Sequence, residues 1–265
     1  MRAILHIART ELRLLFATPV AWVVLVLVTF FSGLLFTGAL DVWGRLAAQA
    51  GAAPGGAALL GRMNLTELVV ARVLGSLGLL LVITAPFLSM RLLAEERRSG
   101  SLELLATAPV RPLQVVLGKY LGALAVLGVA LLLVAVFPAL LAAAGRGTAG
   151  GPALEWPTVL SGLLGLLLLG AAALAVGLFF SAVTEIPVLA ALSSLVALLA
   201  LWTATQFTVG AGEAARAAAA ALSAAEHLAP FLQGRIVVSD VLYYLSLAVL
   251  GLWLADRAVE ARRWA

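Results

Sequence analysis

Few residues of this chain are of types that could carry out chemistry. It has no cysteine, and the absence of cysteine excludes thiol catalysis, iron–sulfur ligation and disulfides. It has two histidines, His6 and His227. The Gly118-Lys119 pair is followed by Tyr120, not by the Ser or Thr that a phosphate-binding loop requires. We therefore expect no catalytic, cofactor-binding or metal-binding residue, and no ATP hydrolysis by this chain alone.

The elements that must position the polar residues are membrane helices, as the composition indicates. Of the 265 residues, 63% are hydrophobic and only 11% are charged, and the mean hydropathy is +1.12. An average soluble domain has about 25% charged residues, so this chain could not cover a water-facing surface. The net charge of +4 is spread over short loops, which argues against nucleic-acid binding. The composition predicts an all-α polytopic membrane protein, with residues 1–265 as one domain.

Six apolar windows predict six transmembrane helices, since a spanning helix needs roughly 20 apolar residues. Five windows contain no ionisable residue, and the sixth contains Asp240 near its start. Proton-coupled carriers place titratable groups at mid-membrane, so a secondary transporter is disfavoured. The windows are 19–40, 73–90, 120–145, 157–184, 186–212 and 236–255.

The distribution of basic residues predicts that both termini are cytoplasmic, according to the positive-inside rule. The first window is longer than the roughly 7–15 residues of a signal-peptide core, so we interpret it as a retained span. With the N-terminus inside, the outer segments hold six basic residues and the inner segments hold 11, which are Arg2, Arg9, Arg13, Arg91, Arg97, Arg98, Arg111, Lys119, Arg257, Arg262 and Arg263.

The segment before the first window is amphipathic. Arg2, His6, Arg9 and Arg13 recur at helical spacing and form one cationic stripe. Such a helix lies in the membrane interface, with its arginines towards anionic lipid or a cytoplasmic partner. The alternative is a basic leader that only sets the topology, and the regular stripe favours the interfacial helix.

The longest predicted cytoplasmic loop runs from residue 91 to residue 119. Gly100 can end an inward extension of the second span, and Ser101 can cap a short helix. Pro109 can close that helix, and Pro112 suits the first turn of the third span. A short helix held below the bilayer could transmit force from a soluble partner, whereas the alternative is an ordinary solvated loop.

This loop resembles the E-E-x-x-x-G-(T/S)-L-E-x-L-x-x-x-P…G-K stretch of type-2 ABC transporter permeases. The matching residues run from Glu95 to Val110 and continue to Gly118-Lys119, with Ser101 in place of the commoner Thr. Segments near both ends of the chain agree, so the resemblance covers nearly the whole sequence. The nearest subgroup is the gliding-motility type of ABC permease.

The resemblance implies a core of two permease subunits, a homodimer or a pair of paralogues. Two copies of a separate ABC ATPase subunit would bind ATP and Mg²⁺ beneath it, and an extracytoplasmic accessory protein would accompany the motility type. It also implies that residues 2–16 form the connecting helix. The ATPase-coupling residues would be Glu95, Glu96, Arg97, Arg98, Gly100, Ser101, Leu102, Glu103, Leu104, Leu105 and Pro109.

The resemblance further implies short re-entrant helices before the last span. Residues 212–234 occupy that place, with His227, Pro230 and Gly234 expected at the breaks. The small pair Gly118 and Gly122 is interpreted as a helix-packing surface.

Uncharged polar residues are densest in the fifth window. They could line a transport path between two subunits, or they could hydrogen-bond within their own helix or between helices. These residues are Thr203, Thr205, Gln206 and Thr208.

We therefore predict the permease subunit of an ABC exporter, in the plasma membrane of a bacterium or archaeon and surrounded by membrane lipid. The alternative is a non-transporting membrane scaffold of a motility or envelope complex that recruits an ATPase for mechanical work. An intramembrane enzyme is disfavoured because paired catalytic groups are missing from the windows.

Overall fold

The computed structural model of the chain describes residues 2–52, 65–98, 111–145, 154–208, 210 and 212–261, and within these ranges every regular element is a helix. In chain order the elements are α1 (Arg2–Ala17), α2 (Pro19–Ala52), the π-helix η1 (Thr66–Ala71), α4 (Arg72–Ser89), α5 (Arg91–Arg98), α7 (Pro112–Gly145), α8 (Trp156–Val183), α9 (Pro187–Trp202), the 3₁₀ helix η2 (Ala204–Thr208), α10 (Glu213–Leu222), α11 (Ala224–Leu232) and α12 (Val238–Ala261).

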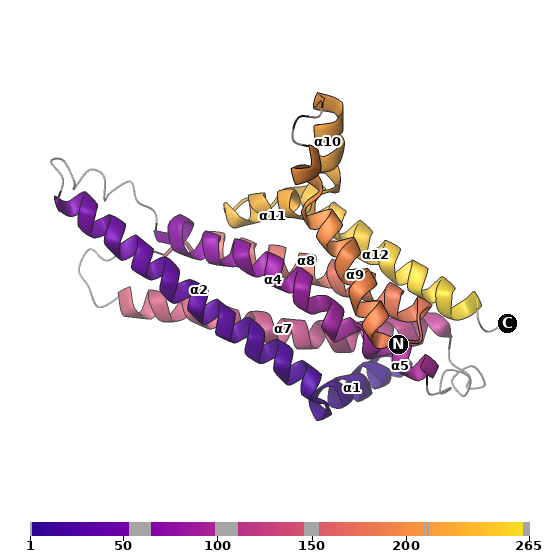
Figure 1. The fold of residues 1–265 in the computed structure, drawn as a ribbon. Helices are drawn as coiled ribbons and strands as arrows, with labels where there is room; N and C mark the ends of the chain where they lie inside the picture. The colour runs from indigo at the N-terminus through magenta and orange to yellow at the C-terminus, as the bar shows by residue number, and fades with distance from the viewer. Residues whose placement is uncertain are drawn as a thin grey trace.

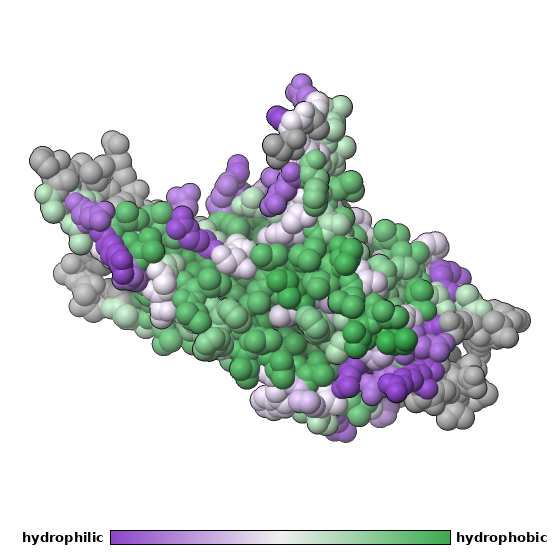
Figure 2. Space-filling model, viewed as in Figure 1, coloured by the Kyte–Doolittle hydropathy of each residue, from purple (hydrophilic) through white to green (hydrophobic). Residues whose placement is uncertain are grey.

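The long helices form an elongated bundle, and α8 lies at its centre. It packs against α4, α7, α9, α11 and α12 (Figure 1). The N-terminus, the C-terminus and α5 lie at one end of the bundle, and α10 projects away from the bundle beyond the other end of α9 (Figure 1). The surface is hydrophobic over the middle of the bundle and hydrophilic towards both ends (Figure 2), as expected for helices that cross a bilayer.

Five helical stretches in the described part are long and apolar enough to cross a membrane, and they coincide with the first four predicted windows and the last one. The chain is therefore a multi-pass membrane protein. The stretches are Pro19–Ala52, Thr66–Arg98, Pro112–Ala144, Trp156–Val183 and Val238–Ala261.

The fifth predicted window, 186–212, was wrong at its end. The α-helix in this window is α9, which has 16 residues and stops at Trp202. At 1.5 Å per residue it is about 24 Å long, shorter than the roughly 30 Å hydrocarbon core. The Thr203 hydroxyl donates to the Leu199 carbonyl at 2.7 Å, and the chain continues as η2. A crossing by α9 thus remains a prediction.

Other helices are longer than their apolar windows. The helix α2 continues from 40 to Ala52, and its extension carries an exposed ion pair between Asp41 and Arg45 at 2.8 Å. The helix α7 begins at Pro112, which confirms the predicted role of this proline. Hydropathy detects only the part of a helix that is apolar, so polar extensions at the membrane boundary fall outside the windows.

The segment 212–234 forms two short helices, as predicted, but its breaks differ from the expectation. Ser223 ends α10 and caps α11, accepting a hydrogen bond from the Glu226 amide at 3.4 Å. Gly234, with φ of +78°, makes the turn into α12, as predicted. His227 and Pro230 lie inside α11 and not at breaks. Whether the two helices are re-entrant stays a prediction.

Close contact between α12 and α8 depends on Gly251. A Cβ added there would lie 2.7 Å from the carbonyl carbon of Ala175 and 2.8 Å from its oxygen. These are backbone atoms of a central helix and cannot move aside as a flexible side chain would. Small residues at such crossings let membrane helices approach closely.

We expect the substitution Gly251→Ala to destabilise the protein by about 1–3 kcal/mol, because overpacking forces the two backbones apart. The measurement is thermal unfolding in detergent, followed by the fluorescence of the six tryptophans. Gly128→Ala on α7 is the matched control, since an added Cβ there meets nothing within 4 Å. Equal unfolding temperatures for the two variants would contradict the packing argument.

Candidate functional site

The helix α1 lies along α7 and is seated on two glycines. A Cβ on Gly118 would lie 2.6 Å from Cγ2 of Ile7, and one on Gly122 would lie 3.0 Å from Cβ of Glu11. The interpretation of this pair as a packing surface is therefore confirmed. The close approach brings the side chains of α1 within reach of the groups on α7.

The amphipathic pattern predicted for α1 is present in the structure. His6, Arg9 and Arg13 are exposed on one side, whereas Leu15 is buried on the side towards the bundle. The side chain of Arg2 lies outside the described residues. The placement of this helix in the membrane interface remains a prediction.

A buried charge cluster joins α1, α5 and α7. The Lys119 ammonium donates to Oε2 of Glu11 at 2.8 Å and lies 2.9 Å from Oε1 of Glu96. The Lys119 side chain is only 5% exposed, that of Glu11 is 11% exposed and that of Glu96 is 27% exposed. Charges removed from water at this depth need partners close by, so the cluster couples the positions of the three helices.

Sequence reasoning named Glu96 as a coupling residue but did not find its partners. Glu11 was not named as a site residue, and Lys119 was noted only in the Gly-Lys pair and as one of the inner basic residues. One signal was present: Glu11 follows Ile4 and Ala8 at helical spacing and precedes Leu15, so it falls on the apolar face of α1. A carboxylate on such a face indicates a buried cationic partner.

The first turn of α5 is fixed to α8 by one hydroxyl. The Ser181 Oγ accepts hydrogen bonds from the amides of Leu93 at 3.1 Å and Ala94 at 3.0 Å, and it donates to the Met90 carbonyl at 2.9 Å. These amides lie just after the break between α4 and α5, where intrahelical acceptors are missing. The inward extension of the second span is therefore attached to the central helix.

A second contact attaches α5 to the turn between α8 and α9. The Arg97 side chain is 5% exposed, donates to the Ala182 carbonyl and lies 3.8 Å from Glu185. Within the predicted coupling set, Glu96 and Arg97 thus point into the protein. Glu95 and Arg98 are exposed, and Glu95 pairs with Arg91 at 3.7 Å on the surface.

The comparison with protein families identifies the kind of protein that carries this site. The family model described as ABC-2 family transporter protein matches residues 5–247. The chain belongs to the ABC-2 transporter family. No curated protein is similar enough to count as a match.

Membership in the ABC-2 family supports the resemblance stated from the sequence at family level. Members of this family are membrane permease subunits of ABC transporters, which work with a separate ABC ATPase subunit and are typically non-catalytic. The gliding-motility subgroup remains a prediction. The structure shows no cluster of three or more metal-ligating side chains among the residues it describes.

The remaining coupling residues of this ABC-2 chain cannot be compared with the structure, because residues 99–110 lie outside the described residues. They follow α5 directly and end one residue before Arg111. The residues concerned are Gly100, Ser101, Leu102, Glu103, Leu104, Leu105 and Pro109.

The residues proposed to line a path in this ABC-2 chain lie at the end of α9 and in η2. Thr203 donates to Leu199 O at 2.7 Å, and Thr208 donates to Thr205 O at 2.8 Å. Both hydroxyls thus bond locally, as the alternative interpretation expected. Gln206 is exposed, and a role of these residues in a path stays a prediction.

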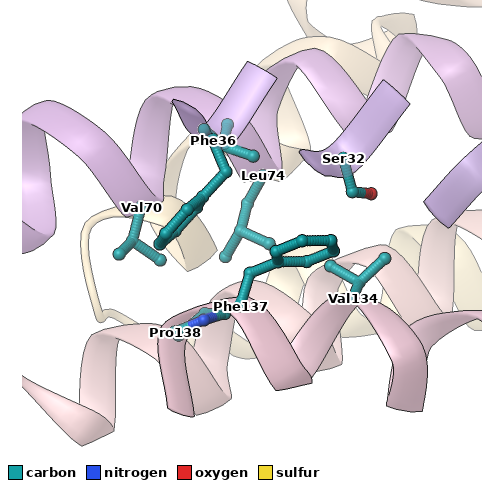
Figure 3. A pocket seen from close by; sticks show the side chains of 8 residues that line it. Ser32, Phe36, Val70, Leu74, Val134, Phe137 and Pro138 are labelled. Carbon is teal, nitrogen blue, oxygen red and sulfur yellow. The ribbon is translucent and has the colours of Figure 1, made fainter. Parts of the chain in front are cut away.

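A small apolar cavity lies between α2, α7 and the η1–α4 stretch (Figure 3). Phe36, Phe137 and Leu74 point into it, and the nearby Ser32 hydroxyl is already used, since it donates to Val28 O at 2.6 Å. The cavity offers no free polar group for orienting a ligand. We therefore interpret it as a packing defect between helices, and the charge cluster is the stronger candidate for function.

Replacing Lys119 by methionine should strand two partly buried carboxylates. We expect a loss of about 3–5 kcal/mol of stability, which is the usual cost of removing one partner from a buried ion pair. The measurement is thermal unfolding in detergent. The triple variant Glu11→Gln, Glu96→Gln, Lys119→Met should recover most of the loss, because neutral partners no longer repel each other.

The control for this prediction is Arg45→Met, which breaks an exposed ion pair whose side chains are 75% and 60% exposed. An exposed pair contributes about 0–1 kcal/mol. If Lys119→Met unfolded at the same temperature as this control, the cluster would not hold the three helices together.

Proposed function

We propose that this chain is the permease subunit of an ATP-driven exporter, paired with a second permease subunit and served by two ABC ATPase subunits that bind ATP and Mg²⁺. The single observation that carries the proposal is the Glu11–Lys119–Glu96 cluster. It connects the helix that leads into residues 99–110, the predicted ATPase contact, to α1 and α7.

The coupling step follows from how α5 is attached. Glu96 ties α5 to α7 and α1, Arg97 ties it to the α8–α9 turn, and Ser181 ties its first turn to α8. A displacement of residues 99–110 by the ATPase would therefore move α5 together with these helices. ATP binding would shift the population between two arrangements of the spans, which requires only that the ATPase prefers one of them.

The path of the chain supports six crossings with both termini in the cytoplasm. The turn before α9 lies beside α5, to which Arg97 ties it, and η2 at the other end of α9 packs against α10. The helix α9 thus leads away from the end that holds both termini, and α12 returns towards it (Figure 1). An even number of crossings places the two termini on the same side, as the basic residues predict.

The cargo that fits this chain best is hydrophobic or lipid-like. Charged residues are missing from α8 and α9, and these helices present no titratable relay for an ion or proton. Export rather than import is the direction we propose, on the resemblance of the loop sequence. No specific observation favours the scaffold alternative.

The test is reconstitution of the chain with the ABC ATPase subunit of the same organism in lipid vesicles. Glu95→Lys reverses a charge on the exposed side of α5 without touching the buried cluster. We expect it to lower permease-stimulated ATP hydrolysis at least about fivefold. A fivefold effect corresponds to the weak end of the usual range of coupling free energies between two sites. Reversing Glu95 and Glu96 together should abolish stimulation.

The matched control is Glu213→Lys, an exposed charge reversal on α10 at the opposite end of the bundle. It should leave stimulated hydrolysis unchanged. Thermal unfolding of each variant separates loss of coupling from loss of folding. Full stimulation by a folded Glu95,Glu96 double variant would overturn the assignment of this region as the ATPase contact.

A further inference from the structure

A second side-chain cluster lies at the end of the bundle opposite to α5. The Nδ1 atom of His227 on α11 is 2.7 Å from Oδ1 of Asp240 in the first turn of α12. Its Nε2 atom is 3.2 Å from the carbonyl oxygen of Ala221 in α10. The His227 side chain is 18% exposed and that of Asp240 is 9% exposed. One imidazole therefore touches three helices.

Both ring nitrogens of His227 face acceptors. A carboxylate and a backbone carbonyl have no proton to give, and a neutral imidazole can donate from only one nitrogen. Only the doubly protonated imidazolium completes both hydrogen bonds. The ring of Tyr243 stacks on the imidazole, with centroids 4.0 Å apart and planes inclined by 19°, and an aromatic face also favours a cation.

Two tyrosines of α12 hold the same corner of backbone. The Tyr243 hydroxyl donates to Leu222 O at 2.7 Å, and the Tyr244 hydroxyl donates to Ala224 O at 2.7 Å. The corner between α10 and α11 is thus held on α12 by these two bonds and by His227. The helix α10 itself is mostly exposed, and its other packing partner is η2.

We propose that His227 is a proton-sensitive clasp that fastens the α10–α11 corner to α12. The clasp is closed when the imidazole is protonated. When the proton leaves, the ring loses its charge attraction to Asp240 and one of its two hydrogen bonds, and the corner loosens. This inference is independent of the proposed coupling to an ATPase, because it concerns only this chain.

The titratable groups around His227 are of other chemical types. Asp240 and Tyr243 face it from α12, Glu226 is its neighbour on α11, and α10 carries Glu213 and Arg216, both exposed. The helices α8 and α9 contain no titratable residue, and α4 contains only Arg72, exposed at its first position. Carboxylates, phenols and guanidinium groups ordinarily titrate well outside the range of about pH 5 to 8, where imidazole changes charge.

The chain permits a direct test because it has no native cysteine. Spin labels on Ala217→Cys in α10 and Leu242→Cys in α12, both exposed positions, report the separation of the two helices by pulsed electron resonance. The labelled full chain is measured in lipid nanodiscs at about pH 5.5 and about pH 8.5, on either side of the imidazole range.

We expect a single short separation at the acidic pH and a second, longer one at the alkaline pH. The ratio of closed to open populations should fall about tenfold between the two pH values, as loss of a charge-assisted hydrogen bond implies. The closed population falls as the pH rises because only the protonated imidazole makes both hydrogen bonds. An unchanged distribution across this range would overturn the proposal.

Variants locate the response. His227→Gln should remove the pH dependence, whereas His6→Gln should retain it, because the other histidine is exposed on α1. Tyr243→Phe keeps the stacked ring but loses the bond to Leu222, and it should still respond to pH. If the response survived in His227→Gln, or disappeared in His6→Gln, the sensor would lie elsewhere and the proposal would be wrong.

Discussion

The burial of the Lys119 ammonium constrains the end of the bundle that carries α5. An ammonium group taken from water needs negative charge at hydrogen-bond distance, and Glu11 and Glu96 provide it at 2.8 and 2.9 Å. Because these residues belong to α1, α5 and α7, removing any one of the three helices breaks at least one ion pair of Lys119. Gly118 and Gly122 make the arrangement possible, since only glycine lets α1 approach α7 so closely.

The two ends of the bundle differ in how firmly they are held. At one end α5 is fixed to the central helix by Ser181 and to the α8–α9 turn by Arg97, which suits a segment that receives force. At the other end α10 is mostly exposed, and the α10–α11 corner depends on hydrogen bonds from His227 and two tyrosines.

Features that rest on local pattern could be predicted from the sequence. The cationic stripe of α1, the start of α7 at Pro112 and the turn at Gly234 follow from periodicity, from the ring of proline and from the backbone freedom of glycine. The end of the fifth window could not be predicted in this way. Uncharged threonines barely lower hydropathy, yet the chain leaves the α-helix at Thr203.

The amino-acid sequence alone settled the class of the protein, because long windows without charge cannot face water and must lie in a bilayer. It could not settle which charges meet. Glu11 and Lys119 are 108 positions apart, and His227 meets Asp240 across a turn between helices. Many pairings of these groups are compatible with the same hydropathy pattern. Only the packing of the helices selects among them, because it decides which side of each helix is turned inward.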